Sequence, residues 1–181
     1  NEESPLDKNI YRINVWGKSK DKLTAESGVN SASFSKSYAY FINTHSDANT
    51  PNTIKLLNKK AEKIRTIKDS KKLHESLQDY ELTEKKFFTF KTSEGIKLNG
   101  WMMKPVNFDE TKKYPVLMYV YGGPGSQTVT NSWGGSNYMW YQSLCQKGYI
   151  IVSIDNRGTG GRGAKFKKCT YKELGKLETI D

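Results

Sequence analysis

The chain has 181 residues, of which 35% are hydrophobic and 27% are charged, and it carries a formal net charge of +10. These values suit one or two globular domains, and no stretch approaches the roughly 18 apolar residues that a membrane-spanning helix needs. A basic chain can bind nucleic acid or a membrane surface. Its densest basic run, residues 55–72, lacks the aromatic pattern of a single-strand binder and indicates a solvated hairpin surface, so we expect neither partner.

The first 76 residues are polar and carry short patterns in which apolar and polar side chains alternate, as they do in strands. The predicted elements are a strand at 9–15, a turn followed by a strand at 33–42, and a hairpin with strands at 53–57 and 62–67 around a turn at 58–61.

Two segments of this half repeat at a constant offset of 44 residues. The matching positions are Ile10, Ile13, Asn14 and Leu23, followed by Ile54, Leu57, Asn58 and Ile67. A period of about 40–50 residues with short strands is typical of β-propeller blades. Two coincidental hairpins are the alternative, and the equal length of the two hairpins disfavours it.

The pattern changes near residue 77. Strands are predicted at 86–91 and 96–103, joined by a turn at 92–95. Two later segments, 114–121 and 149–154, are nearly continuous in apolar residues, which is typical of parallel strands covered on both faces. Residues 138–147 between them have helical length and end at Gly148, a suitable C-terminal cap. Strand, helix and strand in this order predict the βαβ unit of an α/β domain.

A glycine-rich stretch, Tyr-Gly-Gly-Pro-Gly-Ser-Gln at residues 121–127, follows the first of these apolar strands. Open α/β sheets bind ligands at the carboxyl ends of their strands, and glycines let the backbone approach a reacting group closely. In α/β-hydrolases a glycine-rich loop at this place supplies part of the oxyanion hole, which stabilises the negative charge on the carbonyl oxygen during acyl transfer.

A second glycine-rich loop, residues 154–163, follows the next apolar strand, and Asp155 and Arg157 are suited to hold it through ionic hydrogen bonds. The loop lacks the Gly-Lys-Ser/Thr sequence of a phosphate-binding P-loop. No helix of the right pattern is predicted directly after it, which disfavours a dinucleotide site. The two cysteines, Cys145 and Cys169, lack metal-site spacing. We therefore expect no metal and no cofactor, and two free thiols, with a disulfide between them left open.

Together the two loops resemble the opening of the hydrolase domain in the prolyl oligopeptidase family (S9) of serine peptidases, above all in its dipeptidyl peptidase IV branch. The matching residues are 114–117, 121–127 and 155–160, with a weaker likeness at 168–171 and 174–178. The resemblance covers essentially the whole chain. It implies a mixed fold, with C-terminal blades of a β-propeller at 1–76 and the N-terminal part of an α/β-hydrolase catalytic domain at 77–181.

The resemblance also implies a function. Members of this branch are serine exopeptidases that release N-terminal X-Pro dipeptides from peptides through an acyl-enzyme. Tyr121 matches the family tyrosine whose neutral phenol donates to the oxyanion. The residues matching the supporting loops are Gly122, Gly123, Pro124, Asp155, Arg157 and Gly158. The family further implies export, to the periplasm, the cell surface or the medium, and frequent homodimerisation. A tripeptidyl or acylaminoacyl peptidase, or a non-catalytic propeller and pseudo-hydrolase binding module, stays open as an alternative.

The remaining catalytic groups are not found in the sequence. A serine nucleophile needs a G-x-S-x-G elbow, and the nearest match, residues 134–138, fails at its last position. His45 and His74 both lie in the propeller-like half. The resemblance places the elbow after Asp181 and the substrate-binding glutamates before the first residue. We therefore expect a fragment that is inactive alone, depends on the remainder of the same polypeptide, and exposes apolar faces of its sheet.

Overall fold

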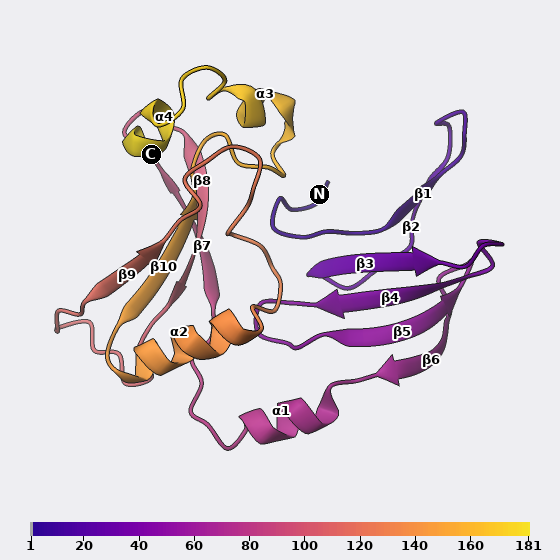
Figure 1. Cartoon of the computed structure of the whole chain (residues 1–181), viewed down its shortest axis with the longest axis horizontal. Helices are drawn as coiled ribbons and strands as arrows, with labels where there is room; N and C mark the ends of the chain where they lie inside the picture. Colours follow the sequence, from indigo (N-terminus) through magenta and orange to yellow (C-terminus); the bar gives the residue numbers. More distant parts are fainter. Residues whose placement is uncertain (1) are drawn as a thin grey trace. The chain divides into compact units, whose positions relative to one another are not determined.

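The computed structural model describes residues 2–181, which form two compact units built mainly on β-sheets with few helices (Figure 1). The first unit comprises the described residues up to Tyr80 together with Thr130–Trp133. The second comprises Glu81–Val129 and Gly134–Asp181. The short segment at 130–133 therefore interrupts the second unit in sequence and packs among the residues of the first.

Two antiparallel sheets form the first unit. They consist of the pair β1 (Tyr11–Ile13) and β2 (Lys20–Lys22), and of β3 (Val29–Phe34), β4 (Tyr40–Ser46), β5 (Thr53–Asn58) and β6 (Lys63–Lys68) in chain order. A short helix, α1 (Lys71–Leu77), follows β6. The hairpin predicted around residues 58–61 is confirmed. The strand predicted at 9–15 is shorter in the structure, and β3 has no counterpart among the predictions.

The sequence repeat corresponds to two turns of the same build. In each turn an asparagine side-chain oxygen accepts a hydrogen bond from the backbone N–H four residues later, and its carbonyl accepts one from the residue three positions on, which has a positive φ. The turns are Asn14 with Gly17 and Lys18, and Asn58 with Ala61 and Glu62. The two turns therefore share these hydrogen bonds at the positions that repeat in the sequence.

The core of the first unit combines residues of the β3–β6 sheet with residues that flank the β1–β2 pair. Leu23, Phe41 and Leu57 are buried, and Ile10 and Ala32 pack against them. Full burial of side chains of this size contributes about 1.5–3 kcal/mol each, so this cluster holds the short β1–β2 pair against the longer meander.

The second unit contains a four-stranded mixed sheet in the order β7-β8-β10-β9. The strands are β7 (Lys86–Lys91), β8 (Lys97–Met103), β9 (Val116–Tyr119) and β10 (Ile150–Asp155). β10 runs parallel to β9 and antiparallel to β8, and α2 (Ser136–Gln146) connects the parallel pair. The predicted strand–helix–strand order is confirmed, as is the hairpin of β7 and β8.

Helix α2 covers the sheet with one face. Its buried residues, Tyr138, Tyr141, Gln142 and Cys145, recur at the spacing that places side chains on one side of a helix. The centroid of the Tyr141 ring lies 5.4 Å from that of the Trp101 ring in β8. The chain leaves the helix at Gly148, whose φ of 84° confirms the predicted cap.

β9 is an edge strand, and its side chains are exposed. Val116, Met118 and Tyr119 are 58%, 54% and 44% exposed, because only β10 pairs with this strand. The apolar run at 114–121 predicts a strand that is covered on both faces. Within residues 2–181, β9 is not covered in this way. The exposure agrees with the expectation that these residues alone leave apolar faces of the sheet uncovered.

Two short helices, α3 (Gly163–Lys168) and α4 (Lys176–Ile180), end the chain. Neither is predicted, because five or six residues carry no periodicity. A helix of six residues, α3, does follow the loop at 154–163 directly. Within residues 2–181, no helix has both the length and the apolar character needed to cross a membrane.

Candidate active-site loops

The two glycine-rich loops lie at the same edge of the second unit's sheet. One begins where β9 ends and the other where β10 ends, and these neighbouring strands are parallel. The N–H of Gly125 in the first loop donates to the carbonyl oxygen of Gly158 in the second, at 2.9 Å. The carboxyl edge of a parallel pair is where α/β sheets bind their ligands, so the structure brings the two predicted loops together at a suitable place.

Tyr121 is presented to solvent at the start of the first loop. Its side chain is 55% exposed, and its phenol makes no hydrogen bond to any residue in 2–181. The ring leans over Gly123, where an added Cβ would lie 3.1 Å from the ring carbon Cε1. Gly122 has a φ of 69°, a left-handed conformation that glycine adopts readily. The hydroxyl of Tyr121 is therefore available as a donor to a ligand at this edge.

The end of the same loop is held firmly. Asp155 is 3% exposed, and its Oδ1 accepts hydrogen bonds from the N–H and hydroxyl of Thr128, at 2.8 and 3.1 Å, and from the N–H of Val129 at 3.2 Å. From the other side, Nε1 of Trp101 donates to the carbonyl oxygen of Thr128 at 3.0 Å. Asp155 thus anchors the loop that carries Tyr121, whereas its predicted role is to hold its own loop.

Burial raises the pKa of Asp155, and hydrogen bonds from Thr128, Val129 and Gln127 lower it in part. These donors favour the ionised carboxylate, because each offers a hydrogen to a charged acceptor. With its oxygens occupied in this way, Asp155 acts as a structural support of the first loop.

Arg157 connects the second loop to two distant acidic residues. Its side chain is 11% exposed and binds Asp181 through Nε at 2.9 Å and Nη2 at 2.8 Å, while Nη1 lies 2.7 Å from Glu94. The backbone N–H of Arg157 also donates to Asp181, whose side chain is fully buried. The hydrogen bond that Arg157 donates to Asp181 is the main cause that raises the pKa of Arg157. Sequence reasoning gave no sign of Glu94 or Asp181, because neither belongs to a motif.

Gly158 occupies a place that only glycine fits. Its φ is 96°, and a Cβ there would lie 2.8 Å from the hydroxyl of Thr170, which is buried. Its N–H donates to the carbonyl of Phe166, so the second loop closes back onto α3. The predicted supporting residues around Tyr121, Asp155 and Gly158 are therefore neighbours in space. The partners of Arg157 are instead Glu94, in the β7–β8 turn, and Asp181.

A catalytic serine–histidine pair is absent from residues 2–181. Ser136 is the first residue of α2. His45 lies in the first unit, where its Nε2 is 2.8 Å from the carbonyl oxygen of Ser27, and His74 lies exposed on α1. In this part of the chain, no group of three or more His, Cys, Asp and Glu side chains is placed to hold a metal ion.

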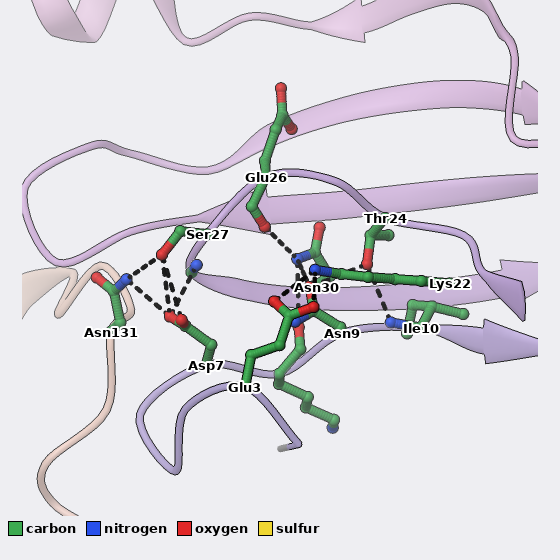
Figure 2. Close-up of polar contacts among 12 residues, drawn as sticks. Glu3, Asp7, Asn9, Ile10, Lys22, Thr24, Glu26, Ser27, Asn30 and Asn131 are labelled. Carbon is green, nitrogen blue, oxygen red and sulfur yellow. Dashed lines mark hydrogen bonds and ion pairs between the residues drawn. The ribbon is translucent and has the colours of Figure 1, made fainter.

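Five residues beyond the first loop's Ser126, Asn131 is bound within the first unit. Figure 2 shows its side chain facing Asp7 and Ser27; Nδ2 donates to Oδ1 of Asp7 at 2.8 Å and to the hydroxyl of Ser27 at 3.2 Å. Its Oδ1 accepts from the N–H of Ala48 at 3.0 Å. All polar atoms of this side chain are thus used to fix the segment at 130–133, which follows directly on the anchored Thr128.

Comparison with known proteins supports the similarity of the whole chain to one kind of enzyme. The family profile described as the dipeptidyl peptidase IV (DPP IV) N-terminal region matches residues 1–52, and that of the prolyl oligopeptidase family matches residues 136–181. Dipeptidyl peptidase 4 of Arthroderma otae is 39% identical over 158 residues, which are 86% of this chain and 20% of that protein. Dipeptidyl peptidase 4 of Trichophyton rubrum is 37% identical over the same shares.

The crystal structure of Porphyromonas gingivalis dipeptidyl peptidase 4 superposes with a TM-score of 0.90 and 42% identity, over 97% of this chain and 25% of that one. The β-rich fold and the matched segments define a relative of the dipeptidyl peptidases. The chain belongs to the prolyl oligopeptidase family, S9, of serine peptidases. It spans about a fifth of the length of the curated relatives that it matches.

Proposed function

We propose that the polypeptide carrying this chain is a serine exopeptidase that releases N-terminal dipeptides, with proline preferred at the second position. The observation that carries the proposal is the phenol of Tyr121, which is exposed and makes no hydrogen bond within residues 2–181. It lies at the carboxyl edge of a parallel strand pair, on a loop whose end is anchored by Asp155. The names of the similar proteins, dipeptidyl peptidase 4, support the substrate class.

The two units take different parts in this proposal. Residues 1–76 form C-terminal blades of a β-propeller, in keeping with the four-stranded meander and its repeated hairpin turn. Residues 77–181 form the N-terminal part of an α/β-hydrolase catalytic domain, in keeping with the βαβ unit and the two loops at its carboxyl edge. The propeller admits substrates by size and the hydrolase domain cleaves them.

In the proposed reaction a serine hydroxyl attacks the carbonyl carbon of the second residue of the peptide, and a histidine takes the hydroxyl proton. The carbonyl oxygen becomes negatively charged, and the hydroxyl of Tyr121 donates a hydrogen bond to it. The C–N bond then breaks, the amine of the remaining peptide leaves with the proton, and water hydrolyses the acyl-enzyme. Nucleophile, acid and base come from residues outside 1–181, since this chain supplies the oxyanion strand only.

The partners and location follow the same resemblance. We infer peptide substrates with proline at the second position, the remainder of the same polypeptide as a structural partner, and a homodimer as the assembly. Export to the periplasm, the cell surface or the medium suits an enzyme that digests peptides outside the cytoplasm. These inferences rest on similarity to the dipeptidyl peptidases.

The test is Tyr121→Phe in the longest natural polypeptide that carries this sequence, assayed with Gly-Pro-p-nitroanilide. Loss of one oxyanion donor should lower kcat by about 100- to 1,000-fold with little change in KM. Tyr119→Phe is the matched control, because Tyr119 is an exposed tyrosine at the end of β9, two residues before Tyr121, and loss of its hydroxyl should leave kcat unchanged. An equal kcat for Tyr121→Phe and wild type would refute the role of Tyr121.

Two further assays separate the alternatives. Faster hydrolysis of a tripeptidyl or N-acetylated anilide than of Gly-Pro-p-nitroanilide would assign the protein to one of the other peptidase activities of this family. No hydrolysis of any of these substrates, together with no labelling by a fluorophosphonate, would favour the non-catalytic binding module.

A further inference from the structure

An open pocket of about 540 Å³ adjoins the first glycine-rich loop. Pro124 of that loop forms one wall, and the opposite wall comes from the chain at and after the end of α3. The lining is mainly apolar, with three lysines at its rim; it includes Pro124, Lys167, Lys168, Tyr171, Lys172 and Leu174. Tyr171 and Leu174 are 75% and 67% exposed, so the apolar surface of the pocket is open to a ligand.

The charge of this pocket is positive and unbalanced. Lys167, Lys168 and Lys172 are exposed and form no ion pair with any carboxylate among residues 2–181. The acidic residues nearby are already engaged with other groups. Glu173 pairs with Lys176 at 3.3 Å, Glu178 accepts from the N–H of Gly175 at 3.0 Å, and Asp181 pairs with Arg157 at 2.8 Å. An apolar pocket with a cationic rim is complementary to a peptide segment that carries a carboxylate.

The pocket is close to the peptide bond whose carbonyl oxygen would accept a hydrogen bond from Tyr121. Pro124 is three residues after Tyr121, so their Cα atoms are at most about 11 Å apart, and an extended peptide advances about 3.3 Å per residue. On the pocket side of the same loop, the Cε atom of Lys167 would lie 3.5 Å from a Cβ placed on Gly125. One to three residues of substrate therefore bridge from the reacting carbonyl to the lysines.

The sign of the charge decides which side of the substrate enters. The segment before the cleaved bond consists of two residues and begins with a positively charged amino group, which three lysines would repel. The segment after the bond carries carboxylates that have no free amino group beside them. These are its acidic side chains and, in a short peptide, its terminal carboxylate.

We propose that the pocket at Pro124, Lys167 and Lys172 binds the leaving segment of the substrate and favours a carboxylate one to three residues after the cleaved bond. This proposal rests on the proposed function. It adds a preference on the leaving side to the preference for proline in the released dipeptide that is proposed above.

The experiment uses the longest natural polypeptide that carries this sequence and a set of Gly-Pro hexapeptides. Each peptide has Glu, Gln or Lys at the first, second or third position after the bond, alanine elsewhere, and an amidated C-terminus. A pentapeptide, Gly-Pro-Ala-Ala-Ala, is made both with a free and with an amidated C-terminus. The rate of Gly-Pro release from each peptide is measured by mass spectrometry and gives kcat/KM. We expect a Glu peptide to exceed its Gln partner about three- to tenfold at one position or more, with Lys lowest. The preference should shrink between 0.05 and 0.5 M NaCl, since exposed charges are screened.

The free-carboxyl peptide separates the two sources of the carboxylate, because it exceeds its amidated form only if the terminal group reaches the lysines. Lys167→Gln combined with Lys172→Gln should bring the Glu-to-Gln ratio close to one. Lys176→Gln is the matched control: it removes a lysine of the same segment that is paired with Glu173 and is not part of the pocket, so the ratio should persist. Equal cleavage of Glu, Gln and free-carboxyl peptides by the wild type, or an unchanged ratio in the double variant, overturns this proposal alone. Failure to cleave any Gly-Pro peptide overturns the proposed function with it.

Discussion

The two glycine-rich loops lie next to each other, but their side chains are held very differently. The loop after β9 begins with a tyrosine that is 55% exposed and without a hydrogen-bond partner within residues 2–181. In the loop that follows β10, two charged side chains are held by partners: Asp155 is 3% exposed, and Arg157 is bound to two carboxylates. The difference indicates a division of work, in which one loop presents a donor and the other keeps it in place. Substitutions should therefore separate effects on activity from effects on stability.

The largest loss of stability is expected for Arg157→Met. The change leaves the buried carboxylate of Asp181 without its guanidinium, and breaking a buried pair by removing one partner costs about 3–5 kcal/mol. The free energy of unfolding, measured by urea denaturation, is the readout. Arg12→Met is the control, since the Arg12–Asp21 pair is about half exposed on both sides and exposed pairs contribute about 0–1 kcal/mol. Equal losses in the two variants would contradict the structural role of Arg157.

A somewhat smaller loss is expected for Asp155→Ala. The N–H groups of Thr128 and Val129 lose their acceptor, and each unsatisfied buried donor costs about 1–3 kcal/mol, so we expect a loss of about 2–4 kcal/mol. Because Thr128 anchors the loop that carries Tyr121, kcat should also fall at temperatures where the variant is folded. Asp155→Asn retains one acceptor oxygen and should recover roughly half of both losses. If Asn behaved no better than Ala in both assays, the hydrogen bonds to Thr128 and Val129 would not be the reason.

The next effect concerns backbone conformation. Gly158→Ala introduces a Cβ only 2.8 Å from the Thr170 hydroxyl at a φ of 96°, and we expect a loss of about 2–3 kcal/mol from strain and contact together. Gly163→Ala is the matched control, because its φ is 85° but nothing lies within 4 Å of the added Cβ. It should lose only the conformational part, about 1–2 kcal/mol. Thermal denaturation of both variants measures the difference, and its absence would mean that Thr170 yields to the added methyl group.

Local patterns account for what the sequence predicted correctly. The hairpin at 53–67, the strands β7 and β8 and the helix α2 each carry alternation, a turn or an apolar face that is visible without the fold. β3, with the sequence Val-Asn-Ser-Ala-Ser-Phe, carries no such pattern, since it is defined by its pairing with β4. Pairing partners of this kind belong to tertiary structure.

The same limit applies to the candidate site. The glycine motifs identified both loops, because a turn that needs glycine leaves a mark in the sequence. The partners of the charged residues left none: Asp155 binds backbone groups of Thr128 and Val129, and Arg157 binds Glu94 and Asp181. Sequence reasoning could therefore place these loops at one sheet edge, but it did not predict that Asp155 binds the end of the neighbouring loop.

The smallest effect on stability is expected at the residue with the largest expected effect on rate. Tyr121→Phe removes a hydroxyl that makes no hydrogen bond within residues 2–181, from a ring that is more than half exposed, so the free energy of unfolding should change by less than about 0.5 kcal/mol. Urea denaturation of the variant whose kcat has fallen measures this directly. If one loop presents the donor and the other holds it in place, the Tyr121 variant should lose rate without losing stability. The Asp155 and Arg157 variants should lose stability. A destabilised Tyr121→Phe would instead mean that the phenol has a structural partner in the native polypeptide, and its loss of rate would then report on packing.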